Sequence, residues 1–144
     1  MYQRNKEDLA SYFLCNTLIM DVDTAAAAIG VYAFTGVDTV DAFFGCGKIA
    51  VWKRPMKLNE ASYWKAMQQL GKENELSEKL FVQLELFTLR VVYNDPVSKD
   101  LAAGRARKWR QSNKQDTTRL PPDPDSFRQH CLRAHLQVKF TVYL

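Results

Sequence analysis

Apolar side chains recur along this chain mainly at intervals of three and four residues, which is the spacing of an amphipathic helix. The strongest pattern spans residues 77–93, where Ser77 can cap the first turn and Asn94-Asp95-Pro96 follows the last one. The same spacing predicts further helices over about residues 7–20, 24–34, 60–70, 98–110 and from 126 onward. We therefore expect an all-α fold, with residues 1–144 forming one helical domain.

Residue types at the ends of these segments agree with the helical assignment. Residues that commonly cap a helix start precede three of the segments, namely Asp23 or Thr24, Asn59, and Asp125 or Ser126. Gly71 is placed to end the helix over 60–70, because glycine readily adopts the backbone conformation that ends helices. Arg54-Pro55 is expected to end the preceding segment, because the residue before a proline resists the helical conformation.

Two segments near the carboxyl end depart from this simple pattern. Residues 111–124 are mostly polar and end in Pro121-Pro122-Asp123-Pro124, so we expect an exposed loop there. Beyond residue 135, apolar residues alternate with polar or amphipathic ones, which is the period of a strand. The last helix therefore either continues to the end or gives way to a short extended tail. One of its faces is apolar and comprises Phe127, Cys131, Ala134 and Val138.

The composition is that of a soluble globular domain rather than a membrane or secreted protein. Apolar residues make up 47% of the 144 residues and charged residues 25%, close to the usual averages. No run approaches the roughly 20 strongly apolar residues that a membrane span needs. The amino terminus is polar and lacks the apolar core of a secretory signal. Three cysteines at wide spacing fit a reducing compartment, so we expect an intracellular protein with no membrane partner.

Charge is distributed unevenly along the chain, although the net charge is only +4. Residues 1–45 contain 2 basic and 6 acidic side chains, whereas residues 46–144 contain 18 basic and 10 acidic ones. The first part thus carries −4 and the remainder +8. A basic remainder of this kind favours an anionic partner such as nucleic acid, although folded proteins of other functions also segregate charge.

Two glycines one residue apart lie between short segments that can each be helical. Gly45 and Gly47 allow a tight bend and a close approach of another backbone. A helix that begins at Lys48 would direct its first unpaired N–H groups toward a ligand held in that bend. The sequence therefore predicts an anion-binding helix-hairpin-helix unit over about residues 36–54, formed by Gly45, Cys46, Gly47, Lys48 and Lys53.

The hairpin sequence YAFTGVDTVDAFFGCGKIAVWK resembles the helix-hairpin-helix region of PIN-like nucleases of the flap endonuclease type. It is most similar to segments of uncharacterised animal proteins of mobile-element descent, which read HAFTGCDTTSAFFGKGKKTAWK. The later stretch LPPDPDSFRQHCLRAHLQV is similar to the LPP…DSL.QH..RANYQ ending of the same group. The two stretches together cover somewhat over a quarter of the chain and occur in the same order.

This resemblance implies particular roles for matching residues. In the nucleases the hairpin backbone contacts DNA phosphates, which implies a phosphate role for Gly45, Gly47 and Lys48. The carboxylate that corresponds to Asp38 binds catalytic metal, so the resemblance implies magnesium or manganese there if the chain is nuclease-competent. The other metal carboxylates of the family lie in an amino-terminal sheet domain that this chain lacks. We therefore expect no catalysis by the chain alone.

A basic run within the predicted helix over 98–110 is a second candidate for phosphate contact. Its four cations surround Trp109, whose indole could stack on a base: Arg105, Arg107, Lys108 and Arg110. A solvated helix face with Trp109 buried explains the pattern equally well. The same run also fits a nuclear-import signal, which makes the nucleus one option for the location of the protein.

Two smaller constellations have simpler explanations than metal binding. His130, Cys131 and His135 could each ligate zinc, but the sequence offers no second pair at suitable spacing to complete four ligands. Asp21-Val22-Asp23 could be a remnant of the nuclease Asp-x-Asp metal pair, although an acidic turn that caps a helix accounts for it as well.

Three functional hypotheses follow. The preferred one is a DNA-binding module that uses the hairpin and the basic helix, without complete catalytic machinery. The second is a metal-dependent nuclease part, with Asp38 as one ligand, that a missing amino-terminal domain completes. The third is a relict or protein-interaction domain in which Gly45 and Gly47 only form a tight connection.

Overall fold

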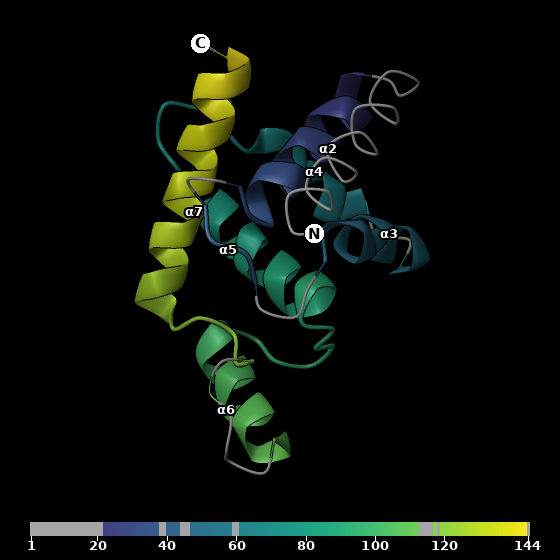
Figure 1. Cartoon of the computed structure of the whole chain (residues 1–144), viewed down its shortest axis with the longest axis vertical. Helices are drawn as coiled ribbons and strands as arrows, with labels where there is room; N and C mark the ends of the chain where they lie inside the picture. The colour runs from purple at the N-terminus through teal and green to yellow at the C-terminus, as the bar shows by residue number, and fades with distance from the viewer. Residues whose placement is uncertain are drawn as a thin grey trace, which may run out of the picture.

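The computed structural model describes residues 22–37, 40–43, 47–58, 61–112, 117 and 119–143. Within these residues the fold is all-α, as expected, and the only extended pairing is one antiparallel bridge between Val37 and Val40. The elements in chain order are α2 (Val22–Phe34), α3 (Lys48–Leu58), α4 (Ala61–Gln69), α5 (Glu78–Phe87), the π-helical turn η1 (Thr88–Val92), α6 (Leu101–Gln111), α7 (Pro124–Val138) and the π-helical turn η2 (Lys139–Tyr143) (Figure 1). The helix expected over 7–20 lies outside the described residues.

Helix α2 is the central element of the bundle and packs against both α4 and α7. Its sequence is rich in alanine and nearly free of charge, and most residues of its second half are buried, as expected for a helix covered by others on more than one side. Gly30 is what allows the close approach of α4, because a Cβ atom there would overlap the main-chain carbonyl of Met67. The alanine run that favours a helix locally therefore also sets the spacing of two helices.

Phe34, the last residue of α2, lies at the centre of an aromatic cluster. Its ring centroid is 5.4 Å from that of Phe43, 5.8 Å from Phe87 and 6.3 Å from Phe127. The contacts with Phe87 and Phe127 are edge-to-face, an arrangement that aromatic rings favour. Since these partners come from α5, α7 and the segment after α2, the cluster joins three helices and fixes where the chain leaves α2.

Two predicted helix ends are confirmed, and three helix starts are corrected. Helix α2 begins at Val22, so Asp23 and Thr24 lie within its first turn and do not cap it. Ser77 caps α5 by accepting a hydrogen bond from the Leu80 N–H, and Gly71 ends α4 with a positive φ of 86°. Helix α6 begins at Leu101 rather than near 98, because Asp100 provides its cap. Helix α7 is capped by Asp123 rather than by Asp125 or Ser126, since Pro124 fits the first helical turn well.

The prediction that Arg54-Pro55 ends a helix is wrong, because α3 continues through it to Leu58. The conformational preference of the residue before proline is a bias that packing can outweigh. Here Val51 and Trp52 are buried, and the Trp52 ring packs edge-to-face on Trp64 of α4 at 4.6 Å. This packing holds α3 against α4.

Of the two alternatives for the tail, the structure has the continued helix, and the prediction of an exposed loop before α7 holds only in part. Residues 139–143 are helical because they continue from α7, and no neighbouring strand among the described residues can pair with them. In the expected loop, Thr117 and Arg119 are exposed, but Pro121 is buried. The carbonyl of Pro121 accepts a hydrogen bond from the guanidinium of Arg105, which draws this part of the loop onto α6.

Within the part of the chain that the structure covers, we find no helix with the length and apolar character needed to cross a bilayer.

Candidate nucleic-acid interface

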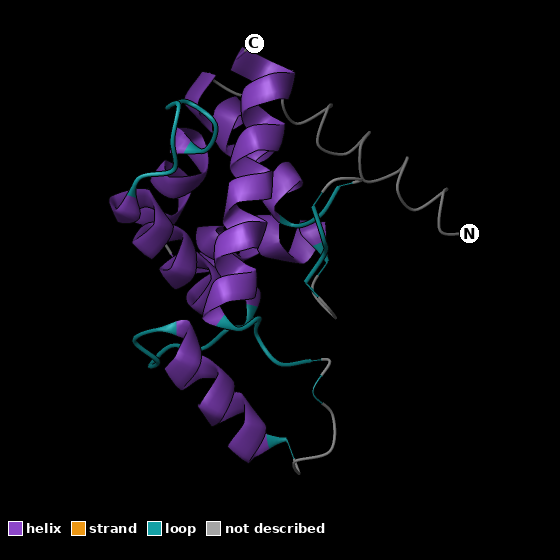
Figure 2. Cartoon of the chain, turned by 90° about the vertical axis from the view of Figure 1, so that its left-hand side faces the viewer, coloured by secondary structure: helices purple, strands orange, loops and turns teal. Residues whose placement is uncertain are grey.

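Helix α6 lies apart from the other helices, at the lower end of the molecule in both views (Figure 1, Figure 2). Its first half is anchored and its second half carries the basic run. Leu101 is buried, and its N–H donates to Oε1 of Glu85 at 2.8 Å. A Cβ atom at position 104 would overlap Leu89, so Gly104 permits the close contact with η1.

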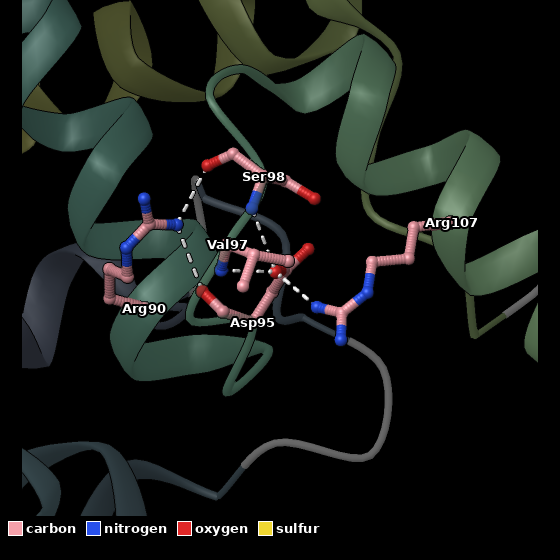
Figure 3. A network of polar contacts seen from close by, with 5 residues as sticks. All are labelled: Arg90, Asp95, Val97, Ser98 and Arg107. Carbon is pink, nitrogen blue, oxygen red and sulfur yellow. Dashed lines mark hydrogen bonds and ion pairs between the residues drawn. The ribbon is translucent and has the colours of Figure 1, made fainter.

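Asp95 connects the segment after η1 to α6 (Figure 3). Its Oδ1 atom accepts hydrogen bonds from the main-chain N–H groups of Val97 and Ser98, each at 3.0 Å, and forms an ion pair of 2.5 Å with Arg107. Arg90 holds the same turn from the other side by donating to the carbonyls of Asp95 at 2.9 Å and Ser98 at 2.8 Å. The turn and α6 are thus fixed to the bundle by two arginines.

The hydrogen bonds at Asp95 also set its protonation. Burial alone would raise the pKa of this carboxyl, but hydrogen bonds from Ser98, Val97 and Arg107 outweigh burial and lower the pKa to about 2. The carboxylate therefore stays ionised at neutral pH, and Arg107 is partly neutralised by it. This role of Asp95 was missed by the sequence prediction, which placed it only in a helix stop.

The four predicted cations of α6 have different surroundings. Arg105 is half-buried against Pro121 and Arg107 is paired with Asp95. Lys108 is half-buried and Arg110 is exposed, and neither forms an ion pair with a described residue. Trp109 is half-buried, so the two interpretations of its indole both stand.

A cavity of about 430 Å³ opens between α6 and the segment after η1. Arg107, Lys108 and Gln111 line it from α6, and Tyr93 and Asn94 line it from the opposite side. The guanidinium of Arg107 has five N–H donors, and Asp95 accepts from its Nη1, so the guanidinium retains further donors. Such a site offers donors and positive charge to an anionic ligand, although the carboxylate of Asp95 also lines it and offsets part of that charge.

The charge around α6 is concentrated. Residues 99–119 contain seven basic and two acidic side chains, a local charge of +5, while the whole chain carries +4. Residues 99–119 therefore hold the largest share of the positive charge, while residues 46–98 and 120–144 together carry +3 and residues 1–45 carry −4.

Lys48, by contrast, is directed into the protein. Its ammonium donates to the carbonyl of Tyr32 at 2.7 Å, to Oγ1 of Thr35 at 3.1 Å and to the carbonyl of Gly36. It also lies 4.5 Å from the centre of the Tyr32 ring. These acceptors surround the carboxyl end of α2, where the helix dipole favours a cation. Lys48 thus begins α3 and caps α2.

The other described residues of the predicted hairpin site, Gly47 and Lys53, are exposed rather than directed into the protein. Gly47 is exposed, and its carbonyl accepts the first hydrogen bond of α3, from the Val51 N–H at 3.1 Å. Lys53 is exposed on the same helix. Gly45, Cys46 and Asp38 lie outside the described residues. Helix α3 packs against α2, α4 and η1, whereas α6 extends from the far side of the turn after η1, so the two predicted phosphate-binding elements form separate surfaces.

Both histidines connect helices. Nδ1 of His135 accepts from the Gly71 N–H at 3.0 Å, and its Nε2 donates to the Glu73 carbonyl at 2.9 Å. Nε2 of His130 donates to the Phe34 carbonyl at 2.7 Å. Cys131 between them is buried, and burial raises the pKa of its thiol. No group of three metal-ligating side chains occurs among the described residues, and Asp23 lies in the first turn of α2, where a negative charge is favourable.

The chain matches no protein-family model, no curated protein and no solved structure. The likeness to the nuclease hairpin thus stays an expectation from the two quoted stretches.

Proposed function

We propose that this chain binds the sugar-phosphate backbone of nucleic acid, DNA in the first instance, through the second half of α6. The observation that carries this proposal is the placement of Lys108 and Arg110 on an anchored helix, within the segment 99–119 of net charge +5, and without an ion pair to any described acidic residue. The helix is fixed at Leu101 and Arg107, so its cations are presented with little loss of backbone freedom on binding.

Binding of this kind is electrostatic and tolerant of sequence. Lysine and arginine side chains that contact phosphates release counterions from the nucleic acid, so affinity falls as salt rises. Trp109, half-buried between the cations, offers an indole edge or face to a base without reading its identity. The exposed first turn of α3, with Gly47 and Lys53, is a second and weaker contact in this proposal. Lys48 is not part of it, because its ammonium is held by α2.

The direct test compares two double variants that change the net charge equally. Lys108→Gln/Arg110→Gln removes the two cations of α6, and Lys72→Gln/Lys79→Gln removes two exposed cations of the bundle. We expect the α6 variant to weaken the affinity for a labelled 20-nucleotide DNA strand, followed by fluorescence anisotropy, on the order of tenfold. We expect the bundle variant to change it by less than about twofold. Equal losses in the two variants would refute a specific role for α6.

A further inference from the structure

A second cavity, of about 410 Å³, shares Tyr93 as a lining residue with the cavity beside α6. Residues 41–43, Tyr93, the segment at Leu120 and Pro122, and the first half of α7 surround it. Its volume falls within the range of small-ligand sites, which begins at about 300 Å³. Half of its lining residues are apolar or aromatic and half are polar or charged, so the cavity is more polar than most small-ligand sites.

His130 provides a fixed hydrogen-bond acceptor in this cavity. The Phe34 carbonyl can only accept, so Nε2 of His130 must carry the proton and Nδ1 must carry the lone pair. Every buried side-chain nitrogen and oxygen atom of the described residues has a partner, and Nδ1 has none among them. Nδ1 is therefore not completely buried, and His130 is one of the residues that line the cavity.

The surroundings of the His130 imidazole favour its neutral form and fix the orientation of its ring. Burial lowers the pKa of His130, while the bond to Phe34 and the charge of Asp41 oppose this effect and Arg133 adds to it. The ring lies 4.5 Å from Phe43 and 5.0 Å from Phe34, centroid to centroid. Phe43 in turn packs edge-to-face on Tyr93 at 6.0 Å. Nδ1 is thus a rigidly placed acceptor beside two aromatic side chains.

Groups of opposite charge lie at the rim of the cavity. Asp41 is an exposed acceptor and Arg133 an exposed donor, and Gln129 can serve as either. A ligand that satisfies these groups needs donors and acceptors along one edge and a flat face for Tyr93, which is half-buried, whereas the Phe43 ring is buried behind it. A bare phosphate would meet the carboxylate of Asp41, which repels it.

We infer that this cavity binds one unpaired nucleobase, with His130 and Asp41 accepting from its edge and Arg133 donating to it. The choice of ligand class rests on the proposed function, because Tyr93 lines both cavities and the adjacent Pro121 and Pro122 line one each. A strand held at α6 by its phosphates could place a base in this cavity across the shared wall. The preferred partner of the chain is then single-stranded nucleic acid, since a paired base is stacked in the duplex and its Watson–Crick edge is already hydrogen-bonded.

The first test uses free nucleosides, which carry no phosphate and therefore do not depend on the cations of α6. Adenosine, cytidine, guanosine and thymidine are titrated into the full chain while the ¹⁵N resonance of His130 Nδ1 is followed by NMR. We expect at least one nucleoside to shift this resonance in a saturable way. We expect Arg133→Gln and Asp41→Asn each to weaken that binding at least fivefold. Both residues are exposed, so these variants keep the fold.

The matched control is Arg128→Gln, on the same helix, because Arg128 is paired with Glu78 at 2.9 Å and stacks on Phe81 rather than lining the cavity. We expect nucleoside binding to be unchanged in this variant and in Lys108→Gln/Arg110→Gln. If no nucleoside shifts the His130 resonance, or if Arg133→Gln and Arg128→Gln behave alike, the inference is wrong even when the chain binds DNA. Nucleoside binding that Arg133→Gln weakens supports the inference even when the α6 variant binds DNA normally.

A second test distinguishes the contribution of the bases to strand binding from that of the phosphates. An oligonucleotide in which every residue is abasic keeps all its phosphates but has no base to offer. We expect the intact strand to bind the wild-type chain at least fivefold more tightly than the abasic one, because base stacking contributes about 1 kcal/mol or more per base. The Arg133→Gln variant should narrow this ratio. Equal affinities of the two strands for the wild-type chain would contradict base binding while leaving phosphate binding at α6 intact.

Discussion

The ammonium of Lys48 lies 2.7 Å from the main-chain carbonyl of Tyr32, so the first residue of α3 caps the last turn of α2. A helix end leaves its last carbonyls without partners, and here they are all supplied from elsewhere in the chain. Thr35 donates to the Val31 carbonyl, Lys48 to that of Tyr32, Gly36 to that of Ala33 and His130 to that of Phe34. The lysine that the hairpin sequence offers to a phosphate is therefore part of the fold.

Substitution of Lys48 by methionine is expected to destabilise the fold more than it weakens DNA binding. The change leaves half-buried carbonyls without a donor, which costs about 1–3 kcal/mol in free energy of unfolding. Urea denaturation measures this loss. The matched change Lys53→Met, on the exposed side of the same helix, should alter stability by less than about 0.5 kcal/mol. Equal effects of the two substitutions would show that the cap contributes nothing.

Asp95→Asn is expected to weaken the attachment of α6 in a pH-dependent manner. The folded pKa of about 2 is below the usual value of 3.8, so the ionised carboxylate stabilises the fold above about pH 3.8. This contribution is lost as the pH falls through about 2. We expect the variant to be less stable than the wild type by about 1–3 kcal/mol at pH 6, with a clearly smaller difference at pH 2.5. A difference that does not depend on pH would contradict this account of the carboxylate.

His130 is expected to make the fold less stable at mildly acidic pH. Burial lowers its pKa below the usual 6.5, so the unfolded chain binds a proton at this position at a higher pH than the folded chain does. Stability from His130 is therefore complete above about pH 6.5 and is lost as the pH falls through its folded pKa. Unfolding free energies at pH 7.5 and 5.0 should differ in the wild type and differ less in His130→Gln. If the histidine variant retains the full pH dependence, another group is responsible.

Gly30→Ala is expected to destabilise the bundle although alanine favours helices. The new methyl group would lie 3.0 Å from the carbonyl carbon of Met67 and closer still to its oxygen, so α2 and α4 would have to move apart. Overpacking of this kind lowers the free energy of unfolding by about 1–3 kcal/mol, which exceeds the stabilisation of about 1 kcal/mol that alanine provides over glycine in a helix. Gly47→Ala is the control, since a Cβ atom there meets nothing within 4 Å. We expect Gly47→Ala to be neutral or slightly stabilising, and a loss comparable to that of Gly30→Ala would contradict the packing argument.

Helices whose start, apolar period and end are all marked by local residue types could be predicted from the sequence. The helix from Ser77 has a capping residue, an uninterrupted apolar period and a terminating Asn94-Asp95-Pro96, and the structure has all three. The apolar face of α7 was likewise predictable, because all four of its residues, Phe127, Cys131, Ala134 and Val138, are buried. Local signals were insufficient at Arg54-Pro55 and in the tail, where packing and helix continuation outweigh the preferences of single residues.

The roles of charged and titratable residues could not be predicted in the same way. Lys48 and its acceptors are 12 to 16 residues apart in sequence, and His130 and Phe34 are 96 apart. Only the packing of α2 against α3 and α7 brings these groups together. The sequence could therefore not show that Lys48 caps α2, because that role depends on the whole fold, while the binding role expected for the cations of α6 stays a prediction.

The salt dependence of DNA affinity tests the central claim most directly. Each phosphate contact on a single strand contributes about 0.7 to the slope of the logarithm of the binding constant against the logarithm of salt concentration. Removal of two contacts by Lys108→Gln/Arg110→Gln should reduce the slope by about 1.4 relative to the wild type, while Lys72→Gln/Lys79→Gln should leave it unchanged. A wild-type affinity that does not fall with salt, or the same slope in both variants, would contradict nucleic-acid binding through α6.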